Sequence, residues 1–146
     1  MNTTRRILLA DDDEGVRAAL GQVLLMEGYV VIPARNGLEA VQLAAATELD
    51  AVVLDLRMPL QGGWDTFESL SRDHPLTPVL IVTACPNQLF TALGAGVAAL
   101  LEKPVDIPAL LSTLSRLMAE PVEARLARLA GQEGAFDYRP SQQHVG

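Results

Sequence analysis

The feature of this sequence that most limits its fold is a regular alternation of short apolar runs with longer amphipathic stretches. Five apolar runs have the length of β-strands and consist mainly of Val, Ile, Leu and Ala. They occupy residues 7–10, 29–32, 51–54, 79–82 and 98–101. This alternation predicts repeated strand–helix–strand units.

The stretches between the runs carry apolar residues at helical spacing. The clearest faces contain Leu20, Val23 and Leu24; Leu38, Val41 and Ala45; Phe67 and Leu70; and Ile107, Leu110, Leu111, Leu114, Leu117 and Met118. Leu89, Ala92 and Leu93 form a weaker one. The pattern predicts an α/β fold, a doubly wound five-stranded parallel sheet with helices on both faces. We expect the flavodoxin-like order 2-1-3-4-5, which is common for five strands but does not follow from periodicity alone.

The pattern changes after Glu120, where Pro121 interrupts the last long helix. Val122, Leu126 and Leu129 could line a short extra helix, and the polar residues 132–146 resemble a frayed tail. We therefore expect one domain over residues 1–120, followed at 121–146 by a short helix and a flexible tail or linker. No DNA-binding output module is expected in this chain.

The charge, the cysteine count and the length of the first apolar run argue against several classes of function. The net charge of −7 disfavours direct nucleic-acid binding, which needs a basic surface. The single cysteine, Cys85, cannot form an intrachain disulfide, which fits a reducing compartment. The first apolar run is too short for a signal peptide or a membrane span. We expect a cytoplasmic protein without membrane contact.

Polar residues follow four of the five predicted strands. Asp11 and Asp12 follow the first, Asp55 the third, Thr83 the fourth and Lys103 the fifth. In the predicted order the first and third strands are neighbours, about 5 Å apart, so the three carboxylates should converge beyond the strand ends. Crowded carboxylates are unfavourable unless a cation offsets their charge, and oxygen ligands of this kind suit Mg²⁺.

This set of groups suits phosphoryl transfer to a carboxylate. A metal ion neutralises phosphoryl oxygens, a carboxylate such as Asp55 acts as the nucleophile, and a lysine and a hydroxyl complete the charge clamp. Lys103 and Thr83 are the candidates for those two positions. The product would be an acyl phosphate.

At these residues the sequence resembles the receiver domain of two-component response regulators. The matching segments are residues 7–13 (ILLADDD), 53–59 (VLDLRMP), 82–84 (VTA) and 102–104 (EKP). Each is weak alone, but four in the right order at strand ends form a strong signal. The resemblance spans roughly residues 5–119.

The resemblance implies a role for each acidic residue. Asp55 is the phosphoacceptor and also a metal ligand, Asp12 binds Mg²⁺ directly, and Asp11 supports the metal, often through water. The backbone carbonyl of Arg57 completes the protein ligands. The phosphoryl donor would be a sensor histidine kinase or a phosphotransfer protein, and the readout a downstream protein target or output domain. Such a domain catalyses only its own phosphorylation and dephosphorylation, so we do not expect an ordinary enzyme; homodimerisation stays open.

The resemblance also implies a switch, and here the sequence departs from the family. Thr83 would move toward the phosphoryl group, and Lys103 would pair with its oxygens. The bond between Lys103 and Pro104 is expected to be cis. Leu100 stands where the family usually has a Tyr or Phe. Leucine cannot make the ring movement, which puts the usual threonine-to-aromatic relay in doubt.

Two other functions remain open from the sequence. A pseudo-receiver scaffold would never use phosphate, and Leu100 leaves room for it. An aspartyl-phosphate phosphohydrolase would carry a second acid two residues after the nucleophile, but that position is Arg57.

Overall fold

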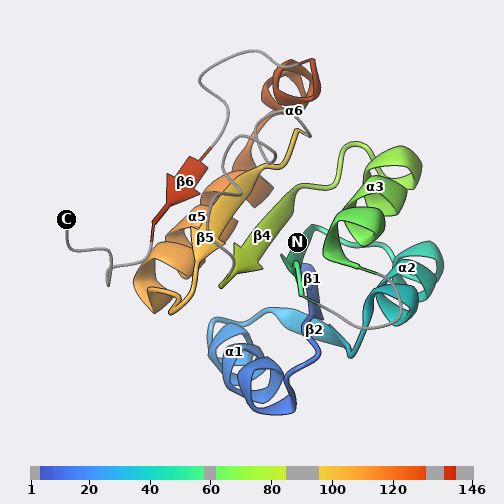
Figure 1. The fold of residues 1–146 in the computed structure, drawn as a ribbon. Coiled ribbons are helices and arrows are strands. Elements are labelled where there is room, and N and C mark those ends of the chain that lie inside the picture. Colours follow the sequence, from blue (N-terminus) through green and yellow to red (C-terminus); the bar gives the residue numbers. More distant parts are fainter. Residues whose placement is uncertain (1–3, 58–61, 85–95, 131–136, 141–146) are drawn as a thin grey trace.

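A six-stranded parallel sheet forms the centre of the molecule (Figure 1). The computed structural model describes residues 4–57, 62–84, 96–130 and 137–140. The strand order is β2-β1-β3-β4-β5-β6, so the predicted order 2-1-3-4-5 is confirmed and one further strand is added. The strands are β1 (Arg6–Ala10), β2 (Val30–Ala34), β3 (Ala51–Asp55), β4 (Val79–Thr83), β5 (Ala99–Glu102) and β6 (Asp137–Arg139).

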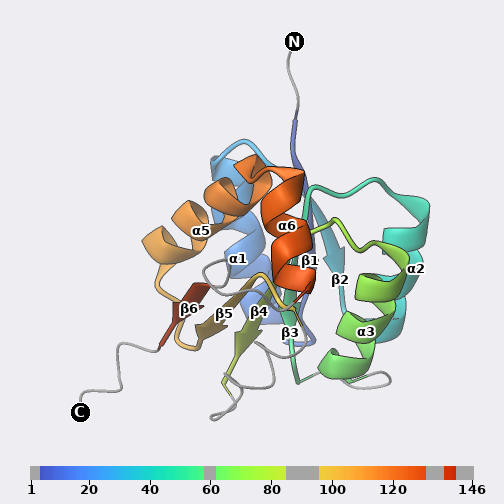
Figure 2. The ribbon, with the colours of Figure 1, turned by 90° about the horizontal axis from the view of Figure 1, so that it is seen from above.

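Helices cover both faces of the sheet (Figures 1 and 2). Helices α1 (Glu14–Met26) and α5 (Ile107–Ala119) pack on one face, and α2 (Gly37–Ala46) and α3 (Gly63–Asp73) pack on the other. The weak apolar face predicted around residues 89–93 lies outside the described residues. None of the helices that the structure describes is long and apolar enough to cross a bilayer.

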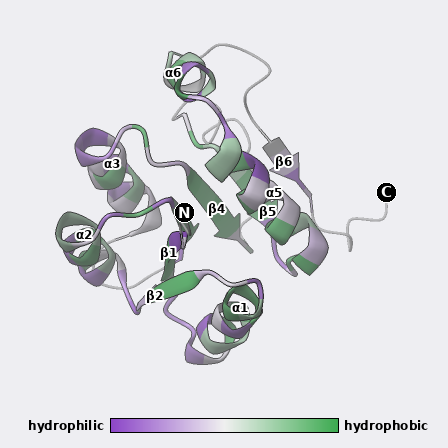
Figure 3. Cartoon of the chain, turned by 180° about the vertical axis from the view of Figure 1, so that it is seen from behind, coloured by the Kyte–Doolittle hydropathy of each residue, from purple (hydrophilic) through white to green (hydrophobic). Residues whose placement is uncertain are grey.

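Alternate residues of each central strand enter two separate cores. Leu9 and Val53 point toward α1 and α5, whereas Leu8 and Leu54 point toward α2 and α3. Because both faces are covered, β3 and β4 are buried along their whole length and contain hardly any polar residues. In Figure 3 β4 is accordingly green, whereas α2 and α3 carry both colours.

Polar caps fix where the first two helices begin. The side chain of Asp13 accepts a hydrogen bond of 3.0 Å from the Val16 amide, and that of Asn36 accepts one of 2.8 Å from the Glu39 amide. Each cap satisfies an amide that the first turn of a helix leaves unpaired. Because Asp13 caps α1, only residues 11–13 separate β1 from α1, and these acidic residues lie at the end of the sheet.

Strand β2 is shifted from its expected position at residues 29–32. It begins at Val30 because the Tyr29 amide donates to the carbonyl of Leu24 in the turn after α1. It also continues through Pro33 to Ala34. Proline is tolerated there because β2 is an edge strand that pairs only with β1.

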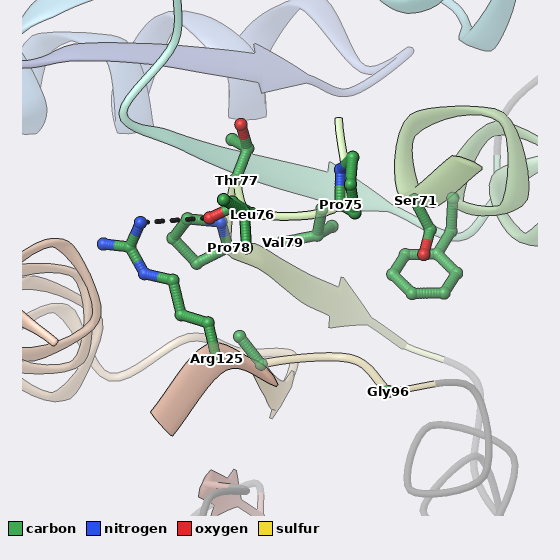
Figure 4. Close-up of a pocket in the computed structure, with 10 residues that line it drawn as sticks. Ser71, Pro75, Leu76, Thr77, Pro78, Val79, Gly96 and Arg125 are labelled. Atoms are coloured by element: carbon green, nitrogen blue, oxygen red, sulfur yellow. Dashed lines mark hydrogen bonds between the residues drawn. The ribbon is translucent and has the colours of Figure 1, made fainter. Parts of the chain in front are cut away.

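Helix α6 (Val122–Leu129) lies where the sequence predicts a short helix, but the helix does not bury the predicted apolar side chains Val122 and Leu126. Val122 and Leu126 are 47% and 52% exposed, and Arg125 points inward instead. Its guanidinium donates to the carbonyls of Leu76, at 3.0 Å, and Leu117, at 3.2 Å. Figure 4 shows Arg125 reaching Leu76 across a small pocket. Arg125 thus links α6 to the end of α5 and to the loop before β4.

Strand β6 corrects the expectation that residues 132–146 form only a frayed tail. Residues 137–139 pair in parallel with β5, with Tyr138 in register with Leu100. A three-residue strand has too few positions to show a periodicity, so the sequence pattern could not reveal it. It covers a strand edge that would otherwise expose unpaired backbone groups.

Glycine is required where α3 starts close to the end of β3. The amide of Gly63 donates to the carbonyl of Leu56 at 3.0 Å. A Cβ atom at position 63 would overlap the backbone of Leu56, which cannot rotate away as a side chain can. Gly21 in α1 has much more room, because the nearest atom to a Cβ there is a side-chain carbon of Leu9 at 3.8 Å.

We predict that Gly63→Ala lowers the free energy of unfolding by about 1–3 kcal/mol, because α3 must move away from β3. Gly21→Ala is the matched control and should be neutral or stabilising by up to about 1 kcal/mol, since alanine favours a helix. Urea denaturation followed by circular dichroism measures both. Equal stability of the two variants would contradict the proposed close approach.

We also predict that Arg125→Ala lowers the free energy of unfolding by about 1–3 kcal/mol, because the carbonyls of Leu76 and Leu117 lose a charged donor. Arg35→Ala is the control. The side chain of Arg35 is 72% exposed and pairs only with Glu39 among the described residues, so its loss should change stability by no more than about 0.5 kcal/mol. The same denaturation assay applies. If both variants are equally stable, the contacts of Arg125 do not stabilise the fold.

Candidate functional site

The parallel register of β1 and β3 brings the acidic residues together. Ala10 pairs with Leu54, so Asp11 and Asp55 each follow one position later on neighbouring strands. Oxygen atoms of Asp11, Asp12 and Asp55 all lie within 4.8 Å of one another. The structure therefore places the three predicted carboxylates in one cluster at the carboxyl end of the sheet.

Lys103 bridges the two buried members of this cluster. Its Nζ atom lies 3.3 Å from Oδ2 of Asp11 and 3.3 Å from Oδ2 of Asp55. The side chains of these two aspartates are only 3% and 5% exposed, whereas that of Lys103 is 23% exposed. The ammonium group thus offsets part of the mutual repulsion of the two buried carboxylates.

Backbone amides hold the other oxygen of each buried carboxylate. The Asp13 amide donates to Oδ1 of Asp11 at 2.9 Å, and the Arg57 amide donates to Oδ1 of Asp55 at 3.1 Å. Each carboxylate therefore presents Oδ1 to its own loop and Oδ2 to Lys103. This division of contacts fixes the orientation of both side chains.

The pKa values of Asp55 and Lys103 are both raised in this cluster. Burial raises the pKa of Asp55 above its ordinary value, the Arg57 amide partly opposes this, and the nearby Asp11 carboxylate raises it further. Burial alone would lower the pKa of Lys103, but the carboxylates of Asp55 and Asp11 outweigh it and raise that pKa. The charged form of Lys103 is therefore stabilised, whereas the ionised form of Asp55 is destabilised relative to its protonated form.

The donor set fits a hard divalent cation. All three acidic side chains offer oxygen ligands, and Asp12 is exposed while the other two are buried. Mg²⁺ commonly uses one or two protein carboxylates and completes its coordination with water and phosphate oxygens. Three oxygen donors within 4.8 Å of one another are compatible with such an ion.

Three further predicted residues lie on or directly after neighbouring strands: Thr83 in β4, Leu100 in β5 and Pro104 just after β5. Thr83 is fully buried at the end of β4, where its carbonyl accepts a 2.8 Å hydrogen bond from the Lys103 amide. The Lys103–Pro104 peptide is cis. Leu100 is fully buried in β5, within the core on the α2 and α3 side. Cys85 lies outside the described residues.

Two contacts near the site had not been predicted from the sequence. Arg17 donates from Nη1 to the carbonyl of Asp11 at 2.7 Å and so braces the acidic segment from inside α1. Tyr138 donates from its hydroxyl to Oε2 of Glu102 at 3.1 Å, beside Lys103. Spacing could have pointed to Arg17, which lies one turn into α1, but no local signal identifies Tyr138.

We predict that Asp55→Asn stabilises the metal-free protein at pH 7. Because the folded-state pKa of Asp55 is raised, its protonated form favours folding below the ordinary pKa, and this advantage is lost as the pH rises through the raised value. Asparagine removes the charge, so we expect a Tm higher by about 2–4 °C in the presence of a chelator, the shift that roughly 1 kcal/mol gives in a chain of this size.

Thermal melts at pH 7 and pH 4 measure this effect, and the difference between the proteins should shrink at pH 4. The exposed-residue control Asp73→Asn should melt with the wild type at both pH values. A lower Tm for Asp55→Asn at pH 7 would mean that the favourable contacts of the charged carboxylate with Lys103 and the Arg57 amide outweigh the cost of its burial and its repulsion by Asp11.

Comparison with known proteins identifies the family. The family model of the response regulator receiver domain matches residues 7–115. A response regulator receiver protein of Anaeromyxobacter sp. (strain Fw109-5) is 38% identical over 109 residues, which cover 73% of this chain and 46% of that protein. The chain thus spans about half or less of the length of the curated relatives it matches first.

Solved structures agree with this match. The CheY-like receiver domain protein of Methanospirillum hungatei JF-1 is 25% identical, with a TM-score of 0.77 over 80% of this chain and 95% of that one. The response regulator TrrA of Thermotoga maritima, solved in complex with Mg²⁺-BeF, is 24% identical, with a TM-score of 0.72 over 78% of this chain and 99% of that one. By sequence and by fold, the chain belongs to the response regulator receiver domain family.

Proposed function

We propose that this receiver domain is a phosphorylation-dependent switch whose Asp55 accepts a phosphoryl group in a Mg²⁺-dependent reaction. The observation that carries the proposal is the environment of the Asp55 carboxylate. It lies 3.3 Å from the ammonium group of Lys103 and shares a cluster with oxygens of Asp11 and Asp12. A nucleophilic carboxylate, a cation and a metal-binding donor set are the components that phosphoryl transfer needs.

Asp11, Asp12 and Asp55 would hold Mg²⁺, together with the backbone carbonyl of Arg57 that the family resemblance implies. When bound, the ion would neutralise charge on the phosphoryl oxygens. A carboxylate oxygen of Asp55 attacks phosphorus, a P–N bond to a donor histidine breaks, and the new O–P bond makes an acyl phosphate. The electron pair of the broken bond stays on the histidine nitrogen.

Lys103 and Thr83 would stabilise the product. The acyl phosphate carries about two negative charges where ionised Asp55 carries one, and Lys103 is already positioned beside an oxygen atom of Asp55. Thr83 ends the neighbouring strand β4, from which its hydroxyl can donate to a phosphoryl oxygen.

The proposed partners follow from family membership. A sensor histidine kinase or a phosphotransfer protein would supply the phosphoryl group, and a downstream protein target or output domain would read the switch. The Mg²⁺-BeF complex of the Thermotoga relative supports a metal-dependent site in a domain of the same fold. A phosphohydrolase is disfavoured because its second acid would occupy the position of Arg57.

We predict that the full chain, incubated with Mg²⁺ and acetyl phosphate, gains the mass of one phosphoryl group. Asp55→Asn should gain none, and a chelator should abolish the reaction because the acidic cluster needs a cation. Intact-protein mass spectrometry measures the product at neutral pH, where acyl phosphates survive long enough to detect.

Asp73→Asn is the control, since this exposed residue lies at the end of α3 and should not affect the reaction. Labelling of Asp55→Asn equal to that of the wild type would disprove the acceptor assignment. A wild-type chain that neither binds Mg²⁺ nor becomes labelled would instead favour a scaffold that does not use phosphate.

A further inference from the structure

Asp12 differs from the other two members of the acidic cluster. Asp11 and Asp55 are buried, and each accepts hydrogen bonds from a backbone amide and from Lys103. Asp12 is exposed, and within the part of the chain that the structure describes it makes no hydrogen bond or ion pair of its own. The position of its carboxylate therefore depends on how firmly the peptide groups on either side of Asp12 are held.

Each of these two peptide groups has a partner. The peptide group after Asp12 is held through the Asp13 amide, which donates to Oδ1 of Asp11 at 2.9 Å. The peptide group before Asp12 is held by Arg17, whose Nη1 atom donates to the carbonyl of Asp11 at 2.7 Å. A charged donor at so short a distance makes a strong hydrogen bond. Among the described residues, Arg17 is the only donor to that carbonyl.

The place of Arg17 in α1 explains how it reaches this carbonyl. Helix α1 begins at Glu14, and the amide of Arg17 donates to the carbonyl of the capping residue Asp13 at 2.9 Å. Side chains of a helix lean toward its N-terminus, so a long side chain at this position reaches back over the cap. The guanidinium thus acts on the backbone of the acidic segment rather than on one of its carboxylates.

We propose that Arg17 is a positioning residue of the phosphorylation site, because it fixes the peptide group before Asp12 and so holds this aspartate in place to bind Mg²⁺. Without the guanidinium, the peptide group between Asp11 and Asp12 can rotate, and the ion must order Asp12 as it binds, which lowers affinity. Groups that orient metal ligands commonly change metal affinity by about 10–100-fold. This inference rests on the proposed function, because it assumes that the acidic cluster binds Mg²⁺.

The positive charge of Arg17 acts in the opposite direction, which sharpens the test. A cation near a Mg²⁺ site repels the ion, so removal of the charge would by itself strengthen binding. We expect Arg17→Ala to bind Mg²⁺ at least about fivefold more weakly by calorimetry, because the loss of orientation outweighs the loss of repulsion.

Arg35→Ala is the matched control for charge. Arg35 is an exposed arginine that follows β2 at the same end of the sheet, but it contacts Glu39 instead of the acidic segment. This variant should bind Mg²⁺ as tightly as the wild type or more tightly.

The Mg²⁺ dependence of phosphorylation separates positioning from a general loss of structure. With acetyl phosphate as the donor, Arg17→Ala should need at least about fivefold more Mg²⁺ for half-maximal labelling, yet at saturating Mg²⁺ its rate should stay within about threefold of the wild type. A structural defect would lower the rate at saturating Mg²⁺ instead. Arg17→Met keeps a long unbranched stem and favours a helix, so it should give the same result and serves in place of Arg17→Ala if that variant does not fold.

The outcomes distinguish this inference from the proposed function. Unchanged or tighter Mg²⁺ binding by the Arg17 variants, beside a wild type that binds Mg²⁺ and is labelled, would overturn the inference and leave the proposed function intact. A lower rate at saturating Mg²⁺ with an unchanged Mg²⁺ requirement would also overturn it. A wild type that binds no Mg²⁺ and is not labelled would overturn both.

Discussion

The bridge that Lys103 makes between Asp11 and Asp55 is the interaction on which the rest of the structure depends. It places one cation 3.3 Å from each of two buried carboxylates that belong to neighbouring strands. Without a positive charge between them, the repulsion between the two carboxylates would be larger. Strands β1, β3 and β5 must therefore end at the same level, and the parallel sheet provides this alignment.

The residues that stabilise the sheet and the residues of the candidate site occupy different positions on it. Its two faces are filled by aliphatic side chains, so β3 and β4 need no polar contacts along their length. The buried carboxylates lie at the carboxyl ends of the strands, where loops and helix starts supply amide donors for Asp11 and Asp55. The site can therefore hold strained charges while the core beneath it stays rigid. The edge strands differ from this centre, because β2 tolerates Pro33 and β6 has only three residues.

Much of the fold and the site could be predicted because the relevant signals are local. Apolar runs and helical spacing indicate the alternating elements, and Asp11, Asp12 and Asp55 follow strands whose order is common for this architecture. The inward position of Arg125 could not be predicted, since its partners Leu76 and Leu117 are carbonyl groups that any residue supplies. Strand β6 was missed for a similar reason, because pairing with β5 depends on backbone geometry more than on residue type.

The sequence by itself determined the element types, the two-sided core and the identity of the acidic, hydroxyl and lysine groups at the strand ends. These follow from hydrophobic periodicity and from which side chains can bind a cation or a phosphoryl group. Only the tertiary structure decided that Tyr138 contacts Glu102, that α6 turns Arg125 inward, and which oxygen of Asp55 contacts Lys103. Such contacts join segments far apart in the chain, and their geometry is set by packing of the whole molecule, which no local pattern encodes.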